Sequence, residues 1–269
     1  MTVARVIARS MADVVEQFEL DGDIVVTIKR LESVMHEIGM SGEPRRLAYE
    51  LQRAGWFGQL RSRHAWEFLP GARGGAYGSG DRFIEFRAQR AIRPEWPGVL
   101  AMESAASVLG LAHRVPEQEV VAFPGDAVFP KALGGEWRYV RVELPDEGIV
   151  RIDGLPSWNR EGLFVGIGVR PSGYKDVAGL GQWLSTSPHE VDAEKIIRLL
   201  APVGAAARQR TTYLLQLAGN TEDALRVVDA YPPKGPAWFG PRQQGGRYDP
   251  LTKVNDTALH KYLSIGSGS

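Results

Sequence analysis

Residues 41–69 read SGEPRRLAYELQRAGWFGQLRSRHAWEFL, and this stretch decides the fold of the N-terminal part of the chain. Its first half places Leu47, Leu51 and Ala54 at three- and four-residue spacing, which predicts a helix that buries one stripe. Ser41 is the expected N-cap of that helix, because a serine side chain can accept a hydrogen bond from an N–H of the first turn. Residues 41–54 are therefore predicted to be helical.

The second half of the stretch predicts a β-hairpin. Gly55 ends the helix, and residues 56–60 and 65–69 are rich in aromatic and apolar side chains. The polar residues 61–64 between them fit a turn. Trp56, Trp66 and Phe68 are expected to form the packing core of this hairpin rather than to stack on bases.

The residues before this stretch predict two more helices and a short strand. Residues 1–20 have apolar side chains on one helical face, and residues 24–26 form a short β-branched run. Thr27 is the expected N-cap of a second helix that ends at Gly39. The buried positions expected on that helix are Ile28, Leu31, Met35 and Ile38. The order of helix, strand, two helices and hairpin is that of a winged helix-turn-helix, within an α+β fold.

Basic side chains on this predicted domain point to a contact with nucleic acid. Residues 41–93 carry ten arginines against five acids, although the net charge of the whole chain is +0. In a helix-turn-helix the second helix enters the major groove, where arginine can bond guanine and glutamine can bond adenine. The residues expected on the exposed face of that helix are Arg45, Arg46, Tyr49, Gln52 and Arg53, with Ser41 at its start.

Further residues are placed to contact DNA phosphates. Lys29 and Arg30 belong to the preceding helix, and Arg61, Arg63 and His64 belong to the hairpin turn. The alternative interpretation is that these side chains are merely solvated on an exposed surface. Charge alone does not separate the two interpretations, so the DNA contact depends on the predicted fold order.

The rest of the chain is expected to form a second, mixed α/β domain. The division is placed at residues 1–93 and 94–263, with residues 264–269 as a flexible tail and the glycine-rich residues 71–80 as a linker or loop. Residues 81–90 fit a strand or a lead into the second domain. The strands expected there are 119–123, 138–144, 149–152 and 163–169, and the helices are 98–111, 193–200, 205–218 and 221–230. The proline-rich residues 231–241 predict irregular coil.

One helix of the second domain combines apolar and polar residues. Tyr213, Leu214 and Leu215, with Leu217 and the later Leu225, are expected to be core. Arg208, Gln209 and Arg210 are expected to be exposed, either as a solvated face or as part of a partner surface.

The motifs of common active sites are missing from the sequence. The chain has no cysteine, and its five histidines are scattered without metal-ligand spacing. Residues 71–80 lack the lysine of a phosphate-binding loop, and the Gly78-Ser79 resemblance to a nucleotidyltransferase motif fails because Arg87 stands where a second acid must follow Glu85. We therefore expect no enzyme activity, no metal and no cofactor. With no membrane span and no secretory signal recognised, we expect a cytoplasmic protein.

Three segments carry a resemblance to a known family. They are residues 47–68 (LAYELQRAGWFGQLRSRHAWEF), 98–110 (GVLAMESAASVLG) and 208–219 (RQRTTYLLQLAG). With them the sequence resembles the AbiEi family of antitoxins, from abortive-infection and toxin–antitoxin systems, over about residues 25–263, and especially its longer, mycobacterial-type members.

The resemblance implies a winged-helix repressor that binds repeats in its own promoter and an antitoxin that counters a nucleotidyltransferase-like toxin, with a role in phage defence. The alternatives are a nuclease that uses the winged helix for targeting, and a pure protein-interaction module.

Overall fold

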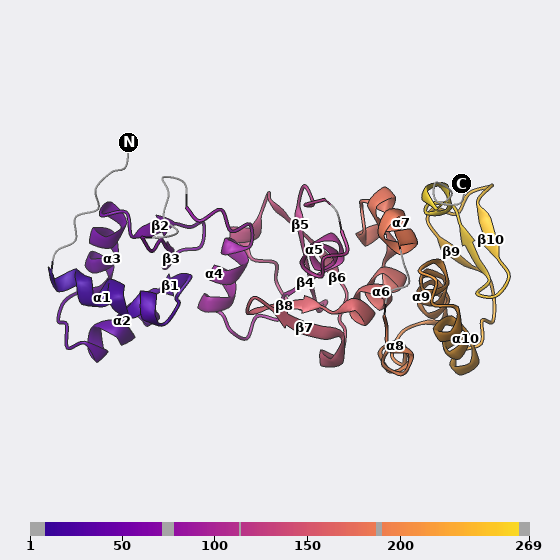
Figure 1. The fold of residues 1–269 in the computed structure, drawn as a ribbon, viewed down its shortest axis with the longest axis horizontal. Coiled ribbons are helices and arrows are strands. Elements are labelled where there is room, and N and C mark those ends of the chain that lie inside the picture. Colours follow the sequence, from indigo (N-terminus) through magenta and orange to yellow (C-terminus); the bar gives the residue numbers. More distant parts are fainter. Residues whose placement is uncertain (1–8, 72–77, 113, 187–189, 264–269) are drawn as a thin grey trace. The chain divides into compact units, whose positions relative to one another are not determined.

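The computed structural model describes residues 9–71, 78–112, 114–186 and 190–263. The chain forms two compact units (Figure 1). The first contains residues 1–96 together with 129–134, and the second contains residues 97–128 and 135–269. The short segment 129–134 therefore belongs to the first unit, whereas the division expected from the sequence assigned it to the second domain.

The first unit begins with helices and strands in the order expected for residues 9–69. They are α1 (Arg9–Leu20), β1 (Val25–Thr27), α2 (Ile28–Glu37), α3 (Pro44–Arg53), β2 (Phe57–Gln59) and β3 (Ala65–Phe68). The strands form an antiparallel sheet in the order β1-β3-β2, with Val26 opposite Trp66 and Phe57 opposite Phe68. The predicted hairpin is confirmed.

The core of this unit explains why the helices form where they do. Leu31, Leu47 and Leu51 are buried together with Phe18, whose ring meets the edge of Phe68 at a centroid distance of 5.4 Å. Amphipathic helices gain most of their stability by burying such a face. Thr27 caps α2 as predicted, since its side chain accepts the N–H of Arg30 at 3.2 Å.

Several details of the first unit differ from the sequence predictions. The N-cap prediction for Ser41 was wrong: α3 begins at Pro44, Glu43 holds the N-cap position without a side-chain hydrogen bond, and Ser41 lies exposed before it. Proline at the first helical position has the required φ and lacks an N–H that would need a cap. Ala54 is half-buried, and Ala48 is buried in its place.

Two further expectations concern the burial of side chains on α2 and the segments at residues 1–8 and 72–77. Ile28 and Ile38 are half-buried rather than buried. The start of the predicted first helix, residues 1–8, and residues 72–77 of the glycine-rich segment lie outside the described residues.

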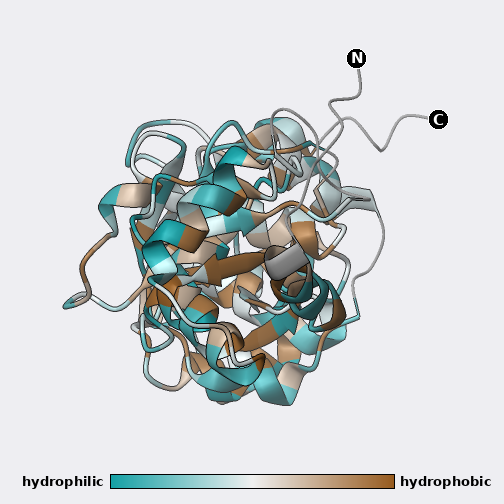
Figure 2. Cartoon of the chain, turned by 90° about the vertical axis from the view of Figure 1, so that its left-hand side faces the viewer, coloured by the Kyte–Doolittle hydropathy of each residue, from teal (hydrophilic) through white to brown (hydrophobic). Residues whose placement is uncertain are grey.

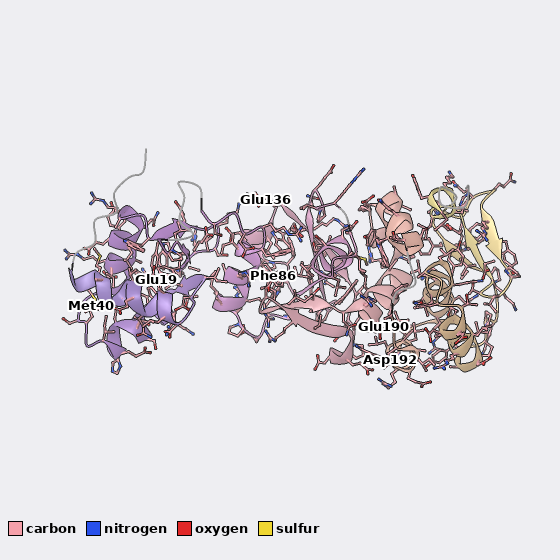
Figure 3. All side chains as sticks on the ribbon, viewed as in Figure 1. Glu19, Met40, Phe86, Glu136, Glu190 and Asp192 are labelled. Atoms are coloured by element: carbon pink, nitrogen blue, oxygen red, sulfur yellow. The ribbon has the colours of Figure 1, made fainter. Side chains whose placement is uncertain are left out.

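Residues 84–90 belong to a helix, and no part of 81–90 is a strand. This helix, α4 (Ile84–Ile92), follows a turn in which the Asp81 carboxylate accepts the N–H of Phe83 at 2.8 Å. Phe86, labelled in Figure 3, is fully buried and meets Trp96 at a centroid distance of 5.6 Å. The apolar residues of this segment thus have helical rather than alternating spacing.

The second unit contains a five-stranded mixed sheet in the order β6-β5-β4-β8-β7. Its strands are β4 (Val99–Leu100), β5 (Glu119–Phe123), β6 (Trp137–Arg141), β7 (Ile149–Ile152) and β8 (Leu155–Trp158). Its helices are α5 (Met102–Val108), α6 (Arg160–Val169), α7 (Val177–Thr186), α8 (Ala193–Leu200), α9 (Ala205–Leu217) and α10 (Thr221–Ala230). Figure 2 shows the chain coloured by hydropathy, with hydrophilic and hydrophobic residues on the same helices, as amphipathic packing requires.

Apart from the polar run of α9, which is described with the site below, four expectations for the second unit were wrong. Residues 98–111 are not one helix, because Val99 and Leu100 pair with β5 before α5 begins. Residues 163–169 lie in the buried helix α6 and not in a strand. Unbroken apolar runs carry no periodicity, so they do not distinguish a buried strand from a buried helix.

The other two concern the C-terminal part. The proline-rich residues 231–241 and the chain after them are not all irregular coil, since β9 (Ala237–Phe239), β10 (Arg247–Asp249) and β11 (Val254–Asp256) form a small sheet. Leu225, expected in the core, is 45% exposed. Tyr213, Leu214 and Leu215 are buried, and Leu217 is half-buried.

Close packing of α6 against α9 organises the centre of this unit. A methyl group added at Gly168 would collide with the hydroxyl of Thr211 on α9, and one added at Gly166 would collide with the ring of Trp158. Glycine thus allows close approach at both positions.

In the described part of the chain, we find no helix with the length and apolar character needed to cross a membrane.

Candidate nucleic-acid interface

Helix α3 has a buried face and an exposed, basic face. Leu47, Ala48 and Leu51 are buried, and the helix contacts α2 and β2 (Figure 1). The opposite side carries Arg45, Arg46, Tyr49 and Arg53, all exposed, with half-buried Gln52 beside them. The side chain of Arg46 is 80% exposed, and Tyr49 is 60% exposed. The structure therefore brings the five helix residues predicted from the sequence onto one surface.

Contacts along the helix leave these side chains at the surface. Arg46 Nε lies 3.1 Å from Glu50 Oε1, one turn further on. The Arg53 guanidinium lies 5.8 Å from the centre of the Tyr49 ring. Exposed pairs of this kind contribute little to stability, so binding to a polyanion can replace them at small cost.

The two basic residues of α2 differ in their surroundings. Lys29 is exposed, whereas the side chain of Arg30 is bonded to both Asp21 and Asp23, the latter at 3.0 Å from Nε. Burial acts to lower the pKa of Arg30, but the hydrogen bonds to Asp23 and Asp21 outweigh it and the pKa is raised. Arg30 thus stabilises the turn before β1, and its charge is already balanced.

The basic residues of the hairpin turn also differ in their surroundings. Arg63 and His64 are exposed, and His64 has a φ of 66° in the left-handed region. The carbonyl of His64 accepts the N–H of Ile28 at 3.1 Å, which joins the turn to the start of α2. Arg61 is also exposed, but its Nη1 donates to the carbonyl of Gly134 at 3.1 Å.

Two acidic residues that the sequence interpretation missed hold the polypeptide around this hairpin. Glu85, 8% exposed, accepts hydrogen bonds from residues 61 and 62. Glu67, 6% exposed on β3, accepts the N–H of Ser79 at 3.0 Å. Their burial was not visible in the sequence, although an acid at an inward position of an alternating strand, as in Glu67, is a signal for an internal partner.

In the second unit, the polar run of α9 was wrongly expected to be exposed. Gln209 is 6% exposed and donates to the carbonyls of Gly235 and Thr252 at 2.6 and 2.9 Å. Arg210 Nε donates to the carbonyl of Gly168 at 2.6 Å, and Arg208 Nε donates to that of Leu200 at 3.0 Å. These side chains satisfy carbonyls inside the unit, including those at the ends of α6 and α8.

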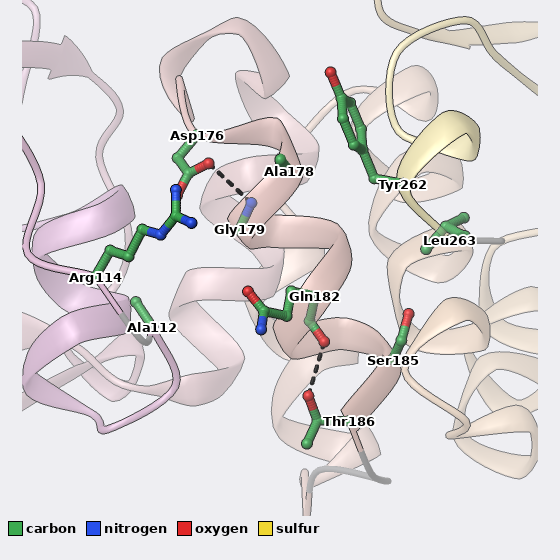
Figure 4. Close-up of a pocket in the computed structure, with 10 residues that line it drawn as sticks. All are labelled: Ala112, Arg114, Asp176, Ala178, Gly179, Gln182, Ser185, Thr186, Tyr262 and Leu263. Atoms are coloured by element: carbon green, nitrogen blue, oxygen red, sulfur yellow. Dashed lines mark hydrogen bonds between the residues drawn. The ribbon is translucent and has the colours of Figure 1, made fainter. Parts of the chain in front are cut away.

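A cavity of about 430 Å³ lies beside α7 (Figure 4). Arg114 points toward Asp176, whose carboxylate accepts the N–H of Gly179 at 2.8 Å at the start of the helix. Gln182, Ser185 and Thr186, further along α7, also line the cavity with mixed hydrogen-bonding groups. Among the described residues, no three histidine, aspartate or glutamate side chains are grouped to hold a metal ion.

Comparison with known proteins identifies a solved structure with a similar fold. No family model matches the chain, and no match was found among curated proteins. The crystal structure of the protein Rv2827c from Mycobacterium tuberculosis is similar with a TM-score of 0.76 and 24% sequence identity. The similarity covers 97% of this chain and 95% of that one, so the two proteins share the fold of both units.

Proposed function

We propose that the chain is a DNA-binding transcriptional repressor whose first unit is a winged helix-turn-helix, and that it also serves as an antitoxin. The observation that carries the DNA-binding half is the exposed face of α3. Three arginines project from it while the opposite face is buried. A helix anchored in this way can enter the major groove without unfolding any part of its own unit.

The arrangement of the surrounding elements supports this proposal. Helices α2 and α3 follow one another across the turn at residues 38–43, and the β2–β3 hairpin comes next, which is the order of a winged helix-turn-helix. In the proposed complex, α3 contacts base edges. Lys29, Arg63 and His64 contact phosphates, because they are exposed on neighbouring elements. Arg30 and Arg61 are removed from the contact set, since both are engaged within the protein.

The experiment that tests this half is an affinity measurement on the duplex upstream of the chain's own gene. The triple substitution Arg45→Ala, Arg46→Ala and Arg53→Ala removes three contacts worth about 1–3 kcal/mol each, so binding weakens by at least roughly 100-fold. The affinity of the unaltered chain falls steeply with salt, since bound phosphates release counterions.

A matched control removes three exposed arginines of the second unit, Arg151, Arg226 and Arg242. This variant keeps its affinity at the same salt concentration. Equal affinities for the two triple variants would exclude α3 as the DNA-contacting helix.

The antitoxin half rests on the resemblance to the AbiEi family. We propose that the second unit counters a nucleotidyltransferase-like toxin encoded beside the gene, and that it does so without catalysing a reaction. Co-expression tests this: the neighbouring toxin alone arrests growth, and the full chain restores it. Continued arrest in the presence of the folded full chain would reject the antitoxin role while leaving DNA binding to be judged separately.

A further inference from the structure

The turn of the β2–β3 hairpin is held from inside the protein by one buried carboxylate. Glu85 on α4 accepts the N–H of Arg61 at 2.6 Å and the N–H and hydroxyl of Ser62 at 3.3 and 3.1 Å. Glu85 and Ser62 are 8% and 5% exposed. Hydrogen bonds to a charged acceptor are stronger than neutral ones, so these bonds fix the path of the turn.

A second anchor comes from residues 129–134, here called the strap. Arg61 Nη1 donates to the carbonyl of Gly134 at 3.1 Å. The short helix Lys131–Leu133 of the strap packs against α4, and Leu133 is 0% exposed. The hairpin turn therefore has a side-chain anchor on α4 and a backbone anchor on the strap.

The strap is a part of the chain whose two ends lead into the second unit. It follows β5 and precedes β6, and among the described residues beyond 96 it alone is assigned to the first unit. The residues just before it are also fixed, because Arg141 on β6 donates to the carbonyls of Gly125 and Ala127. The strap is thus covalently continuous with two paired strands of the second unit, β5 and β6.

We propose that the strap and Glu85 position the hairpin turn for DNA, and that Arg61 is a positioning residue that acts through Gly134 rather than a phosphate contact. This inference rests on the proposed DNA binding. Holding a loop in its bound conformation raises affinity because less order has to be gained on binding. Arg63 and His64, next in the turn, then meet the DNA backbone.

The salt dependence of affinity separates a positioning residue from a phosphate contact. Loss of one phosphate contact lowers the slope of log affinity against log salt by about 1. We expect Arg63→Ala to lower the slope in this way. Arg61→Ala weakens binding about tenfold, by loss of a charge-assisted hydrogen bond, with no change in slope. Arg61→Lys, which can still donate to Gly134, recovers part of the affinity.

Amide hydrogen exchange in the protein without DNA provides a second, independent readout. Glu85→Gln and Leu133→Ala each speed exchange at the amides of Arg61 and Ser62, while exchange within α3 stays unchanged. The control is Val128→Ala, just outside the strap, where the side chain is 76% exposed. This variant leaves both exchange and affinity unaltered.

The outcomes of the two measurements are distinguishable. If Arg61→Ala lowers the slope of log affinity against log salt by about 1, Arg61 is a phosphate contact and the proposal is overturned. Unchanged exchange at residues 61 and 62 in both Glu85→Gln and Leu133→Ala overturns it as well. If the unaltered chain does not bind DNA while exchange responds as expected, the proposed function fails and the anchoring of the turn stands.

Discussion

Helices α3 and α9 carry the same kind of polar run, yet they use it in opposite ways. On α3, Arg45 and Arg46 are exposed on a helix whose other face is buried. On α9, Arg208 and Arg210 donate to backbone carbonyls, and Gln209 between them is buried. Arginine in a helix therefore marks an open surface only where no backbone acceptor lies within reach.

The difference follows from the free carbonyls at helix ends. The last carbonyls of a helix have no partner within it, and a long side chain from a neighbouring helix can satisfy them. Close packing of α6 and α9 at Gly168 brings the end of α6 within reach of Arg210. Substitutions in the two helices should therefore change different properties, stability for α9 and DNA affinity for α3.

The largest expected effect on stability is that of Arg210→Ala. It removes hydrogen bonds to the carbonyls of Gly168 and Val169 and leaves them without that donor, which costs about 3 kcal/mol of unfolding free energy. The matched substitution on α3, Arg45→Ala, changes stability by less than about 0.5 kcal/mol. Chemical denaturation of both variants gives the comparison, and equal losses would contradict it.

Gly168→Ala tests the packing that places Arg210. The added methyl group collides with the Thr211 hydroxyl and forces α6 and α9 apart, at a cost of about 2 kcal/mol. Gly125→Ala serves as the control, because its methyl group would meet nothing within 4 Å. Thermal melts should separate the two variants; a Gly168→Ala protein as stable as the control would show that the contact is not tight.

Tyr213 on α9 and Tyr49 on α3 allow the two helices to be compared by the pH dependence of stability. Tyr213 on α9 donates to the buried carboxylate of Asp256 at 2.9 Å, and burial, with the nearby Asp256 charge, raises the pKa of Tyr213 above its ordinary value of 10.0. The folded protein therefore holds this proton more tightly than the unfolded chain does. The resulting stability is complete below about pH 10 and is lost as the pH rises toward the folded-state pKa.

Tyr213→Phe should cost about 1 kcal/mol at neutral pH and reduce the loss of stability in alkaline solution. Tyr49→Phe on α3 should change neither the stability at neutral pH nor its loss in alkaline solution, because Tyr49 is exposed. Urea unfolding from pH 7 to 11 measures both effects. An alkaline profile unaffected by Tyr213→Phe would assign the pH dependence to other groups.

The smallest expected effect on stability concerns Thr27 and Ser41, the two residues of the first unit that were predicted to be helix N-caps. Thr27→Ala removes the bond to the N–H of Arg30 and costs about 1 kcal/mol, whereas Ser41→Ala costs less than about 0.5 kcal/mol because Ser41 caps nothing. Denaturation midpoints of the two variants test this. Similar losses would mean that Ser41 supports the turn in another way.

The sequence predicted the first unit better than the second for a physical reason. Its elements are short, amphipathic and separated by glycine and polar turns, so periodicity and capping identify each one. In the second unit, α6 has an almost continuous apolar surface, and neither its spacing nor its composition distinguishes it from a buried strand.

For the candidate site, the sequence predicted the exposed face of α3 but not the engagement of Arg30 and Arg61. Both depend on partners brought together by the fold, the acids at residues 21 and 23 and the carbonyl of Gly134. Arg61 and Gly134 are 73 positions apart in the sequence, so no local pattern could reveal the contact. Glu85 was missed for the same reason.

The most direct test of DNA binding by α3 is photo-crosslinking from the middle of its exposed face. With p-benzoylphenylalanine in place of Tyr49, irradiation of the complex with the upstream duplex should attach the protein to bases of the bound site. The same group in place of the exposed Tyr248 on β10 should give no crosslink. A bound duplex that crosslinks at position 248 and not at position 49 would contradict the assignment of α3 as the DNA-contacting helix.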